Sequence, residues 1–322
     1  MKKYRIFFIG IGLLLFLFTA YFITNKILFD GVVPIVINES GIQAKYYSKT
    51  DIDQSAAVVL VGGGQWGDYW AQEFANKGFV GLSLAYTGKD GLPSLPEQIN
   101  LEYFENALKW LVKKSSVDAD KIIVMGASRN AELSLVIASV MPEYVHGVVV
   151  YAPSSVSWSN TVLAYNSDEI KPSWVYREQE IPYVPMPKLI GNDTDKIETL
   201  DYWNKGLNKA EVVEASIQVE RINGPILLFS GEDDQVWPAA QMADLIEQRL
   251  SQYEFQHAFQ NIKYQNSGHL ISGHPEINPS TRTGTMQING KGYQYLYGGT
   301  TEGDKIAKQD AKVKLMEFVE KM

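Results

Sequence analysis

Short apolar runs alternate with amphipathic segments along most of the chain. Each run is five to seven residues long, which suits a strand buried on both faces of a parallel sheet. Between the runs, apolar residues recur at helical spacing. The expected strands are 56–61, 79–85, 121–125, 147–151, 225–230 and 258–264, and the expected helices are 68–77, 101–114, 131–140, 239–250 and 304–321. This order predicts an α/β fold, a doubly wound and mostly parallel sheet with helices on both faces.

Two stretches interrupt the alternation. Residues 153–220 are rich in Pro, Trp, Tyr and Asn, and we interpret them as an insertion over the carboxyl ends of the strands. Residues 272–302 are rich in Gly, Thr and Asn, and we expect a long ordered loop there. The chain then divides into an N-terminal segment 1–30, a linker with possible edge strands over 31–55, and a main domain over 56–322.

The N-terminal segment predicts one membrane helix. Ile6 to Thr24 is a run of 19 uncharged residues, and such a helix spans about 28 Å, close to the hydrocarbon core of a bilayer. Three cations precede the run, which favours a cytoplasmic N-terminus and an exported domain. The alternative is a cleaved signal peptide, but the run is long and residues 18–20 (FTA) match a cleavage site poorly. We expect a membrane-anchored, extracytoplasmic domain, or a secreted one if the segment is cleaved.

Composition excludes several classes of function. The chain has 322 residues, with 29 Lys and Arg against 37 Asp and Glu and a formal net charge of −8, so nucleic acid is not expected as a partner. Cysteine is absent, which excludes disulfides, thiolate metal ligands and a Cys nucleophile. Only 4 His remain for any metal site. We expect no metal and no organic cofactor.

The first candidate motif is the segment 126–130 (GASRN), between an expected strand and an expected helix. A Ser on a sharp strand-to-helix turn holds its hydroxyl exposed, so Ser128 is a candidate nucleophile. The free N–H groups at the start of the helix favour negative charge nearby. Asn130 stands where the usual pattern has Gly, and Asn tolerates unusual backbone angles. The alternative is a plain helix cap in which Ser128 is paired with Glu132.

Two further motifs supply a candidate acid and a candidate base. Asp234 lies in the segment 231–238 (GEDDQVWP), directly after an expected strand, where a carboxylate can orient an imidazole; Asp233 is the fallback. The alternative is a solvated acidic turn that caps the next helix. His269 follows the last expected strand and is placed to transfer a proton, with His274 as its rival. A single loop histidine is more often structural.

The order of the three motifs along the chain supports one common catalytic site. Ser128, Asp234 and His269 each follow a different expected strand, and this is the chain order of a Ser–Asp–His triad on such a sheet. Because the carboxyl ends of parallel strands share one edge, the three side chains are expected to meet there.

The glycine turn 62–65 (GGGQ) follows the first expected strand. The N–H of Gly64 or Gln65, together with that of Arg129, would form an oxyanion hole, in which one donor contributes about 3–4 kcal/mol to the transition state. The alternative is dinucleotide binding, because GGGQWG also fits the G-x-G-x-x-G spacing. That interpretation lacks the acidic residue that a ribose requires after the next strand.

Five segments carry a family resemblance: VGGGQWGDYWAQEFANKGFVGLSLAY, LPEQINLEYFENALKWL, GASRNAELSL, ILLFSGEDDQVWP and SGHL. They resemble the C-terminal catalytic domain of the acyl-CoA thioesterase and bile acid-CoA:amino acid N-acyltransferase family over about residues 55–320. The resemblance implies an α/β-hydrolase fold for 56–322, with Ser128 as nucleophile, Asp234 as acid and His269 as base. The acyltransferases of this family have a Cys nucleophile, so the serine favours hydrolysis.

The chain departs from that family in two respects. Eukaryotic members carry an additional N-terminal β-sandwich domain, for which residues 31–55 are too short, and they act inside cells. The insertion 153–220 has 11 acidic and 6 basic residues, which suits the phosphates of CoA poorly. Its aromatic residues suit an acyl or aromatic group, or form the core of the insertion: Trp158, Tyr165, Trp174, Tyr176, Tyr183, Tyr202 and Trp203.

The sequence therefore predicts a serine hydrolase that cleaves a small-molecule acyl ester or thioester through an acyl-enzyme. Two alternatives stay open: acyl transfer to an amine or hydroxyl acceptor, and a catalytically silent surface binding protein with a hydrolase fold. The expected partners are the acyl substrate and, through the N-terminal helix, a membrane.

Overall fold

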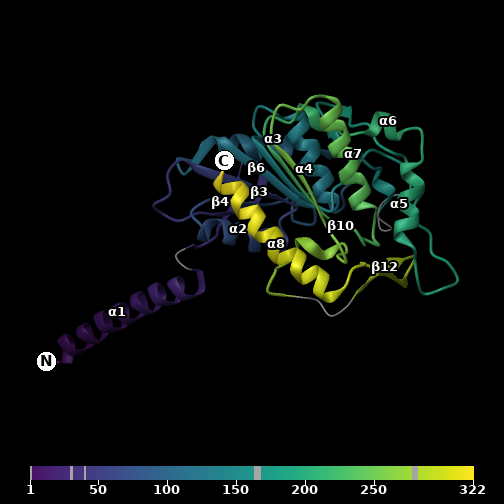
Figure 1. Cartoon of the computed structure of the whole chain (residues 1–322). Helices are drawn as coiled ribbons and strands as arrows, with labels where there is room; N and C mark the ends of the chain where they lie inside the picture. The colour runs from purple at the N-terminus through teal and green to yellow at the C-terminus, as the bar shows by residue number, and fades with distance from the viewer. Residues whose placement is uncertain (1, 30–31, 40, 163–167, 278–281) are drawn as a thin grey trace.

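An eight-stranded sheet runs through the centre of the molecule (Figure 1). The computed structural model describes residues 2–29, 32–39, 41–162, 168–277 and 282–322. The strand order is β1-β2-β4-β3-β6-β7-β10-β11, in which β1 and β2 are antiparallel and the other strands run parallel. The strands are β1 Ile35–Glu39, β2 Ile42–Tyr47, β3 Ser55–Val61, β4 Val80–Ala85, β6 Val117–Ala127, β7 Gly147–Tyr151, β10 Ile226–Gly231 and β11 Phe259–Tyr264.

Helices cover both faces of this sheet, which confirms the predicted doubly wound α/β arrangement. On one face pack α3 Glu102–Leu111, α4 Arg129–Val140 and α7 Ala239–Gln252, and on the other pack α2 Gly64–Asn76 and α8 Thr301–Glu320. Strands β4, β7 and β10 are buried at every position, because each lies between two helical layers. Their unbroken apolar runs follow from that double burial.

The stretch 153–220 forms a separate layer beyond the carboxyl end of β7. It contains β8 Trp174–Tyr176, β9 Gln179–Glu180, α5 Thr199–Leu207 and α6 Val212–Ala215, and the short β5 Ile99–Asn100 pairs with β8. Of its aromatic residues, Trp158 and Trp203 are buried in the core of this layer, whereas Trp174 is buried in the larger core cluster of the sheet. Tyr165 lies outside the described residues.

The expectation of a long loop over 272–302 is wrong. This stretch contains a hairpin of β12 Thr283–Ile288 and β13 Lys291–Leu296, while 278–281 lie outside the described residues. Asn289 and Gly290 connect the two strands with φ of 50° and 79°. An Asn-Gly pair with positive φ is the preferred two-residue hairpin turn. The sequence therefore contained a hairpin signal, but the loop was predicted from the high Gly, Thr and Asn content instead.

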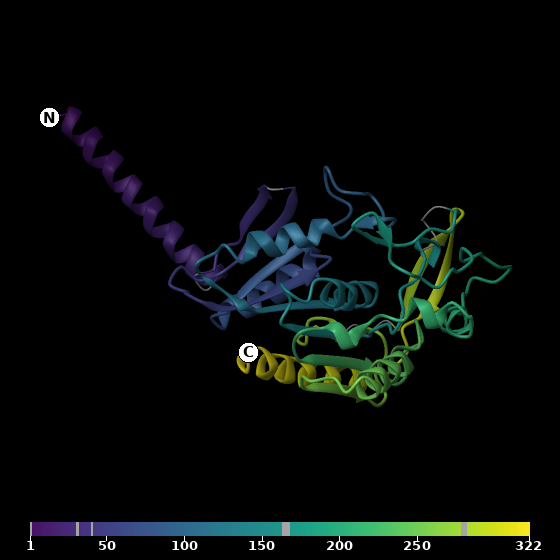
Figure 2. The same ribbon diagram turned by 90° about the horizontal axis from the view of Figure 1, so that it is seen from above.

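The N-terminal helix α1 Lys2–Phe29 extends away from the rest of the molecule (Figures 1 and 2). Its window Phe7–Thr24 is long and apolar enough to cross a membrane by length and composition, and no side chain of that window is buried in the protein. The same test is passed by a signal sequence near an N-terminus.

The burial of two leucines predicts that their replacement by alanine will lower the free energy of unfolding by different amounts. Leu82 on β4 is fully buried in the larger core cluster, whereas Leu245 on α7 is exposed. Leu82→Ala should lower the free energy of unfolding by about 2–5 kcal/mol, because it removes buried methyl groups and leaves a cavity. Leu245→Ala is the control and should change it by less than about 1 kcal/mol. Denaturant unfolding measures both, and equal effects would contradict the assigned burial.

Candidate active site

Ser128 lies on a sharp turn between the end of β6 and the start of α4. Its backbone has φ 57° and ψ −125°, in the left-handed half of φ/ψ space that few non-glycine residues occupy. The turn is tight: a Cβ on Gly126 would lie 2.1 Å from the carbonyl oxygen of Asn130. The Ser128 N–H donates to the carbonyl of Tyr151 on the neighbouring strand at 2.9 Å. Local strain of this kind is typical of functional turns.

Asn130, the departure from the usual glycine pattern, has a structural role. Its Oδ1 accepts a hydrogen bond from the Tyr86 hydroxyl at 2.8 Å. Its amide also fills the space above Gly62, where an added Cβ would lie 2.2 Å from Nδ2. The Asn130 side chain thus joins the turn after β6 to the glycine turn after β3.

The imidazole of His269 connects the Ser128 hydroxyl to the Asp234 carboxylate. Its Nε2 lies 3.0 Å from Ser128 Oγ, and its Nδ1 lies 2.7 Å from Asp234 Oδ2. The N–H groups of Val236 and Trp237 donate to Asp234 Oδ1 at 2.8 and 3.2 Å. The side chains of Asp234 and His269 are 2% and 10% exposed. Burial and these two N–H donors fix the carboxylate in one orientation.

The rival residues are engaged elsewhere. Asp233 accepts from the Gly299 N–H at 2.9 Å and from the Gln235 side chain at 3.1 Å. His274 has its Nδ1 2.5 Å from the Glu276 carboxylate, and its ring lies against that of Tyr69. The Ser128 side chain makes no capping hydrogen bond to α4, so the helix-cap alternative does not describe it.

The glycine turn brings backbone N–H groups to the same edge of the sheet. Gly62 and Gly63 use their N–H groups for turn hydrogen bonds to Leu84 and Leu60. Gly64 and Gln65 are the first residues of α2, and Arg129 is the first residue of α4. N–H groups in the first turn of a helix have no acceptor within that helix, so they are available to an external oxygen.

Glu132, one turn beyond Ser128, is a fully buried carboxylate that accepts hydrogen bonds from the insertion. Its Oε1 accepts from the Trp174 indole at 2.7 Å, the Trp158 N–H at 3.1 Å and the Ser157 hydroxyl at 3.2 Å, while its Oε2 pairs with the Arg129 guanidinium. Burial raises the pKa of the Glu132 carboxyl. The insertion is therefore tied to α4, the helix that follows Ser128, and this role of Glu132 differs from the helix cap considered as an alternative above.

A second buried carboxylate holds the loop of His269. Asp304 on α8 accepts from the Gly268 N–H at 2.8 Å and pairs with Arg282, while the His269 N–H donates to the Tyr297 carbonyl at 2.9 Å. Asp304 is fully buried. Sequence reasoning missed it, because only the folded chain brings α8 to this loop; its position in the first turn of a helix was the one local signal.

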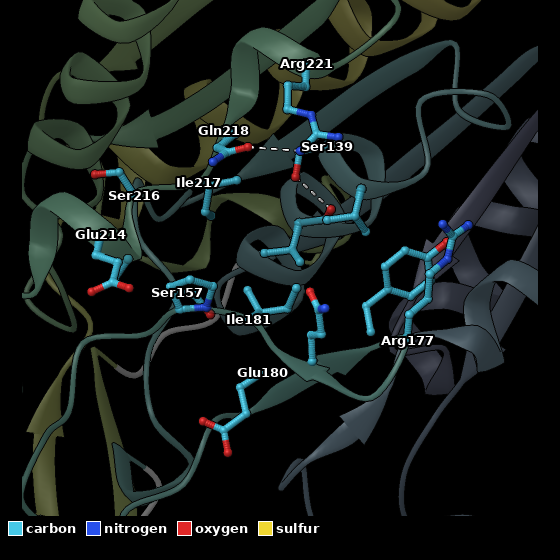
Figure 3. Close-up of a pocket in the computed structure, with 16 residues that line it drawn as sticks. Ser139, Ser157, Arg177, Glu180, Ile181, Glu214, Ser216, Ile217, Gln218 and Arg221 are labelled. Carbon is cyan, nitrogen blue, oxygen red and sulfur yellow. Dashed lines mark hydrogen bonds between the residues drawn. The ribbon is translucent and has the colours of Figure 1, made fainter.

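A cavity of about 460 Å³ lies between the C-terminal half of α4 and the insertion (Figure 3). Ser157 and Ile181 line it, and Arg177 and Arg221 lie on different sides of it. Neither Ser128 nor His269 lines this cavity, so the cavity is separate from the place where Ser128, His269 and Asp234 meet. The hydroxyl of Ser157, which lines the cavity, donates a hydrogen bond to Glu132 at 3.2 Å.

This fold is that of the α/β hydrolases. A dienelactone hydrolase-like promiscuous phosphotriesterase from metagenomic libraries aligns with a TM-score of 0.53 at 12% identity, covering 90% of this chain and 98% of that one. A Mycobacterium tuberculosis puromycin-hydrolyzing peptidase aligns with a TM-score of 0.50 at 16% identity, covering 74% of this chain and 36% of that one. At such low identities the likeness concerns the fold alone.

Sequence comparison gives the family. Residues 99–322 match the family described as BAAT / Acyl-CoA thioester hydrolase C terminal, and the chain belongs to it. Acyl-coenzyme A thioesterase 1 of Rattus norvegicus is 30% identical over 296 residues, which cover 90% of this chain and 65% of the relative. The mitochondrial acyl-coenzyme A thioesterase 2 of Mus musculus is 28% identical, with 90% and 60% covered. The chain thus spans less than two thirds of the length of these relatives.

The buried contacts of Glu132 predict a large loss of stability when its side chain is removed. Glu132→Ala should lower the free energy of unfolding by about 3–5 kcal/mol, because it leaves Arg129 and the donors of the insertion without their acceptor. Glu132→Gln keeps an acceptor oxygen and should lose less. Denaturant unfolding tests this, with the exposed Glu302→Ala as a control expected to change by less than about 0.5 kcal/mol. A Glu132→Ala protein as stable as the control would contradict the role assigned.

Proposed function

We propose that this protein is a serine hydrolase that cleaves an acyl thioester or ester through an acyl-enzyme. The observation that carries the proposal is the continuous contact from Ser128 Oγ to His269 Nε2, 3.0 Å, and from His269 Nδ1 to Asp234 Oδ2, 2.7 Å. The thioesterase names of its relatives support an acyl-CoA thioester as the substrate class. The catalytic domain is 56–322, with 153–220 as its insertion.

Acylation begins at the Ser128 hydroxyl. His269 Nε2 accepts the hydroxyl proton while Oγ attacks the carbonyl carbon of the substrate, and the carbonyl oxygen becomes an oxyanion. Asp234 accepts from Nδ1–H, which keeps the imidazole in the tautomer that can take this proton and stabilises the cation that forms. His269 then gives the proton to the leaving sulfur or oxygen, and the acyl group stays on Ser128.

The N–H of Arg129, with that of Gly64 or Gln65, stabilises the oxyanion in both half-reactions. These groups lie at the first turns of two helices, so the helix dipoles add to the hydrogen bonds. In the second half-reaction His269 takes a proton from the water that attacks the acyl carbon, and it returns this proton to Ser128 Oγ as the bond to the acyl group breaks and the acid is released.

The N-terminal segment 1–30 is a membrane anchor in this proposal. Its helix α1 is long and apolar enough, and the cations before it favour a cytoplasmic N-terminus. The catalytic domain then lies outside the cytoplasm, joined through residues 31–55, which include β1 and β2. Cleavage of the segment would instead release a secreted enzyme.

The first test of this mechanism is the reactivity of Ser128. A fluorophosphonate probe should label the protein, and Ser128→Ala should abolish both labelling and hydrolysis of a panel of acyl thioesters and esters, with a loss of about 1,000-fold or more. The matched control is Ser139→Ala, which changes a buried serine within α4, the helix that follows Ser128, and should keep both labelling and hydrolysis. A folded wild-type protein that neither reacts with the probe nor turns over any substrate would favour the catalytically silent binding protein.

The adjacent aspartates and the two loop histidines allow a paired test. Asp234→Asn and His269→Ala should each lower kcat/KM by about 1,000- to 10,000-fold, because the imidazole loses its orientation or is absent. Asp233→Asn and His274→Ala should remain within about tenfold of wild type, since their partners lie outside the triad. Steady-state kinetics measures all four, and loss of activity in the second pair alone would refute the assignment.

Product analysis separates hydrolysis from acyl transfer. With an amine or hydroxyl acceptor present, we expect the free acid as the main product, because a serine acyl-enzyme is resolved by water. Chromatography of the products with and without acceptor measures this. A dominant amide or ester product would assign the protein to the acyltransferases instead.

A further inference from the structure

Three successive glycines shape the turn that carries two of the expected oxyanion donors. Gly62, Gly63 and Gly64 have φ of 99°, 57° and 66°, values that other residues rarely adopt. Glycine loses more conformational freedom on folding than any other residue, so such a turn keeps one shape only where its surroundings restrain it. The direction of the Gly64 and Gln65 N–H groups depends on that shape. The contacts that hold the turn therefore bear on the oxyanion hole.

Strand β4 holds one part of the turn. The Gly62 N–H donates to the Leu84 carbonyl at 3.0 Å. The backbone of Gly63 lies so close to β4 that an added Cβ would come within 2.8 Å of the Ala85 nitrogen. Since β4 is itself paired with β2 and β3, this support belongs to the central sheet.

Asn130 holds the turn from the side of the nucleophile. Its amide lies against Gly62, where an added Cβ would come within 2.2 Å of Nδ2 and 2.8 Å of Cγ. Asn130 is the second residue of α4 and stands two positions after Ser128, so this contact joins the nucleophile turn to the glycine turn. A glycine at position 130, as the usual pattern has it, carries no side chain that could reach Gly62.

Tyr86 fixes the orientation of the Asn130 amide. Its hydroxyl donates to Asn130 Oδ1 at 2.8 Å. Tyr86 directly follows β4 and is only 6% exposed, and its ring packs against those of Phe104 and Trp174, with centroids 5.5 and 6.1 Å away. A ring held by two aromatic neighbours keeps its hydroxyl in one place, and the amide that accepts from this hydroxyl is held with it.

We propose that Asn130 is a positioning residue for the oxyanion hole and that Tyr86 acts through it. The inference rests on the proposed hydrolase function. The pair joins the end of β4, the nucleophile turn and the glycine turn in one closed set of contacts. The N–H of Arg129 and that of Gly64 or Gln65 then keep the separation that a single oxyanion requires. Because the oxyanion forms only after the nucleophile attacks, loss of this positioning lowers kcat and leaves substrate binding nearly unchanged.

Replacing Asn130 by the usual glycine tests the inference in the full chain. Asn130→Gly should lower kcat by about 10- to 100-fold on the ester or thioester that the wild type turns over fastest, with KM changed by less than about threefold. Tyr86→Phe removes one hydroxyl, keeps the buried ring and should lower kcat by about 3- to 10-fold in the same way. The control is Tyr46→Phe, at a buried tyrosine whose hydroxyl is hydrogen-bonded with Ser116, and its kcat should stay within about twofold of wild type.

A trifluoromethyl ketone with the acyl chain of that substrate reports on the oxyanion hole itself. Ser128 Oγ adds to the ketone carbon, His269 takes the hydroxyl proton, and the ketone oxygen becomes an oxyanion without loss of a leaving group. In each variant the Ki of this inhibitor should rise by the factor by which kcat/KM falls. A purely structural defect would lower the fraction of active protein and leave both Ki and KM unchanged.

The double variant tests whether Tyr86 acts through Asn130. Asn130→Gly combined with Tyr86→Phe should lose no more activity than Asn130→Gly alone. A further loss on adding the second change would overturn the inference, and so would a fall in kcat without the matching rise in Ki. If Asn130→Gly does not fold, Tyr86→Phe is judged by the same kcat and Ki criterion.

The wild type separates this inference from the hydrolase proposal. An active wild type together with an Asn130→Gly protein of unchanged kcat and Ki would overturn the role of Asn130 and leave the hydrolase proposal intact. A folded wild type that neither turns over a substrate nor reacts with a fluorophosphonate would remove both.

Discussion

The contact of one imidazole with two partners is the constraint on which the structure of the site depends. His269 must reach Ser128 with one nitrogen and Asp234 with the other, although these residues lie 141 and 35 positions away along the chain. The parallel sheet brings the three residues together because each follows a different strand, β6, β10 or β11, and the carboxyl ends of these strands lie at one edge. The rest of the fold holds that edge rigid.

Two buried carboxylates outside the triad provide much of this rigidity. Glu132 ties the insertion to the helix behind Ser128, and Asp304 ties α8 to the loop of His269. Each is fully buried and each has a guanidinium partner, so neither charge is left without compensation. The nucleophile turn and the base loop are thus each fixed by a polar contact from a distant element.

The sequence pattern predicts those features of the fold and site that residues close together in the chain determine. The apolar runs identified the six parallel strands, and the order of Ser128, Asp234 and His269 indicated one common site, because chain order and strand ends are both readable in sequence. The contacts of Glu132 and Asp304 join elements far apart in the chain, and no spacing encodes them. The β12–β13 hairpin is a different case: its Asn-Gly turn was readable, and composition hid it.

A crystal structure of the protein after reaction with a fluorophosphonate tests the central claim most directly. The account predicts phosphorus bonded to Ser128 Oγ, with a phosphonyl oxygen between the N–H of Arg129 and that of Gly64 or Gln65, and with His269 still bonded to Asp234. An adduct on another residue, or an oxygen turned away from these N–H groups, would contradict it.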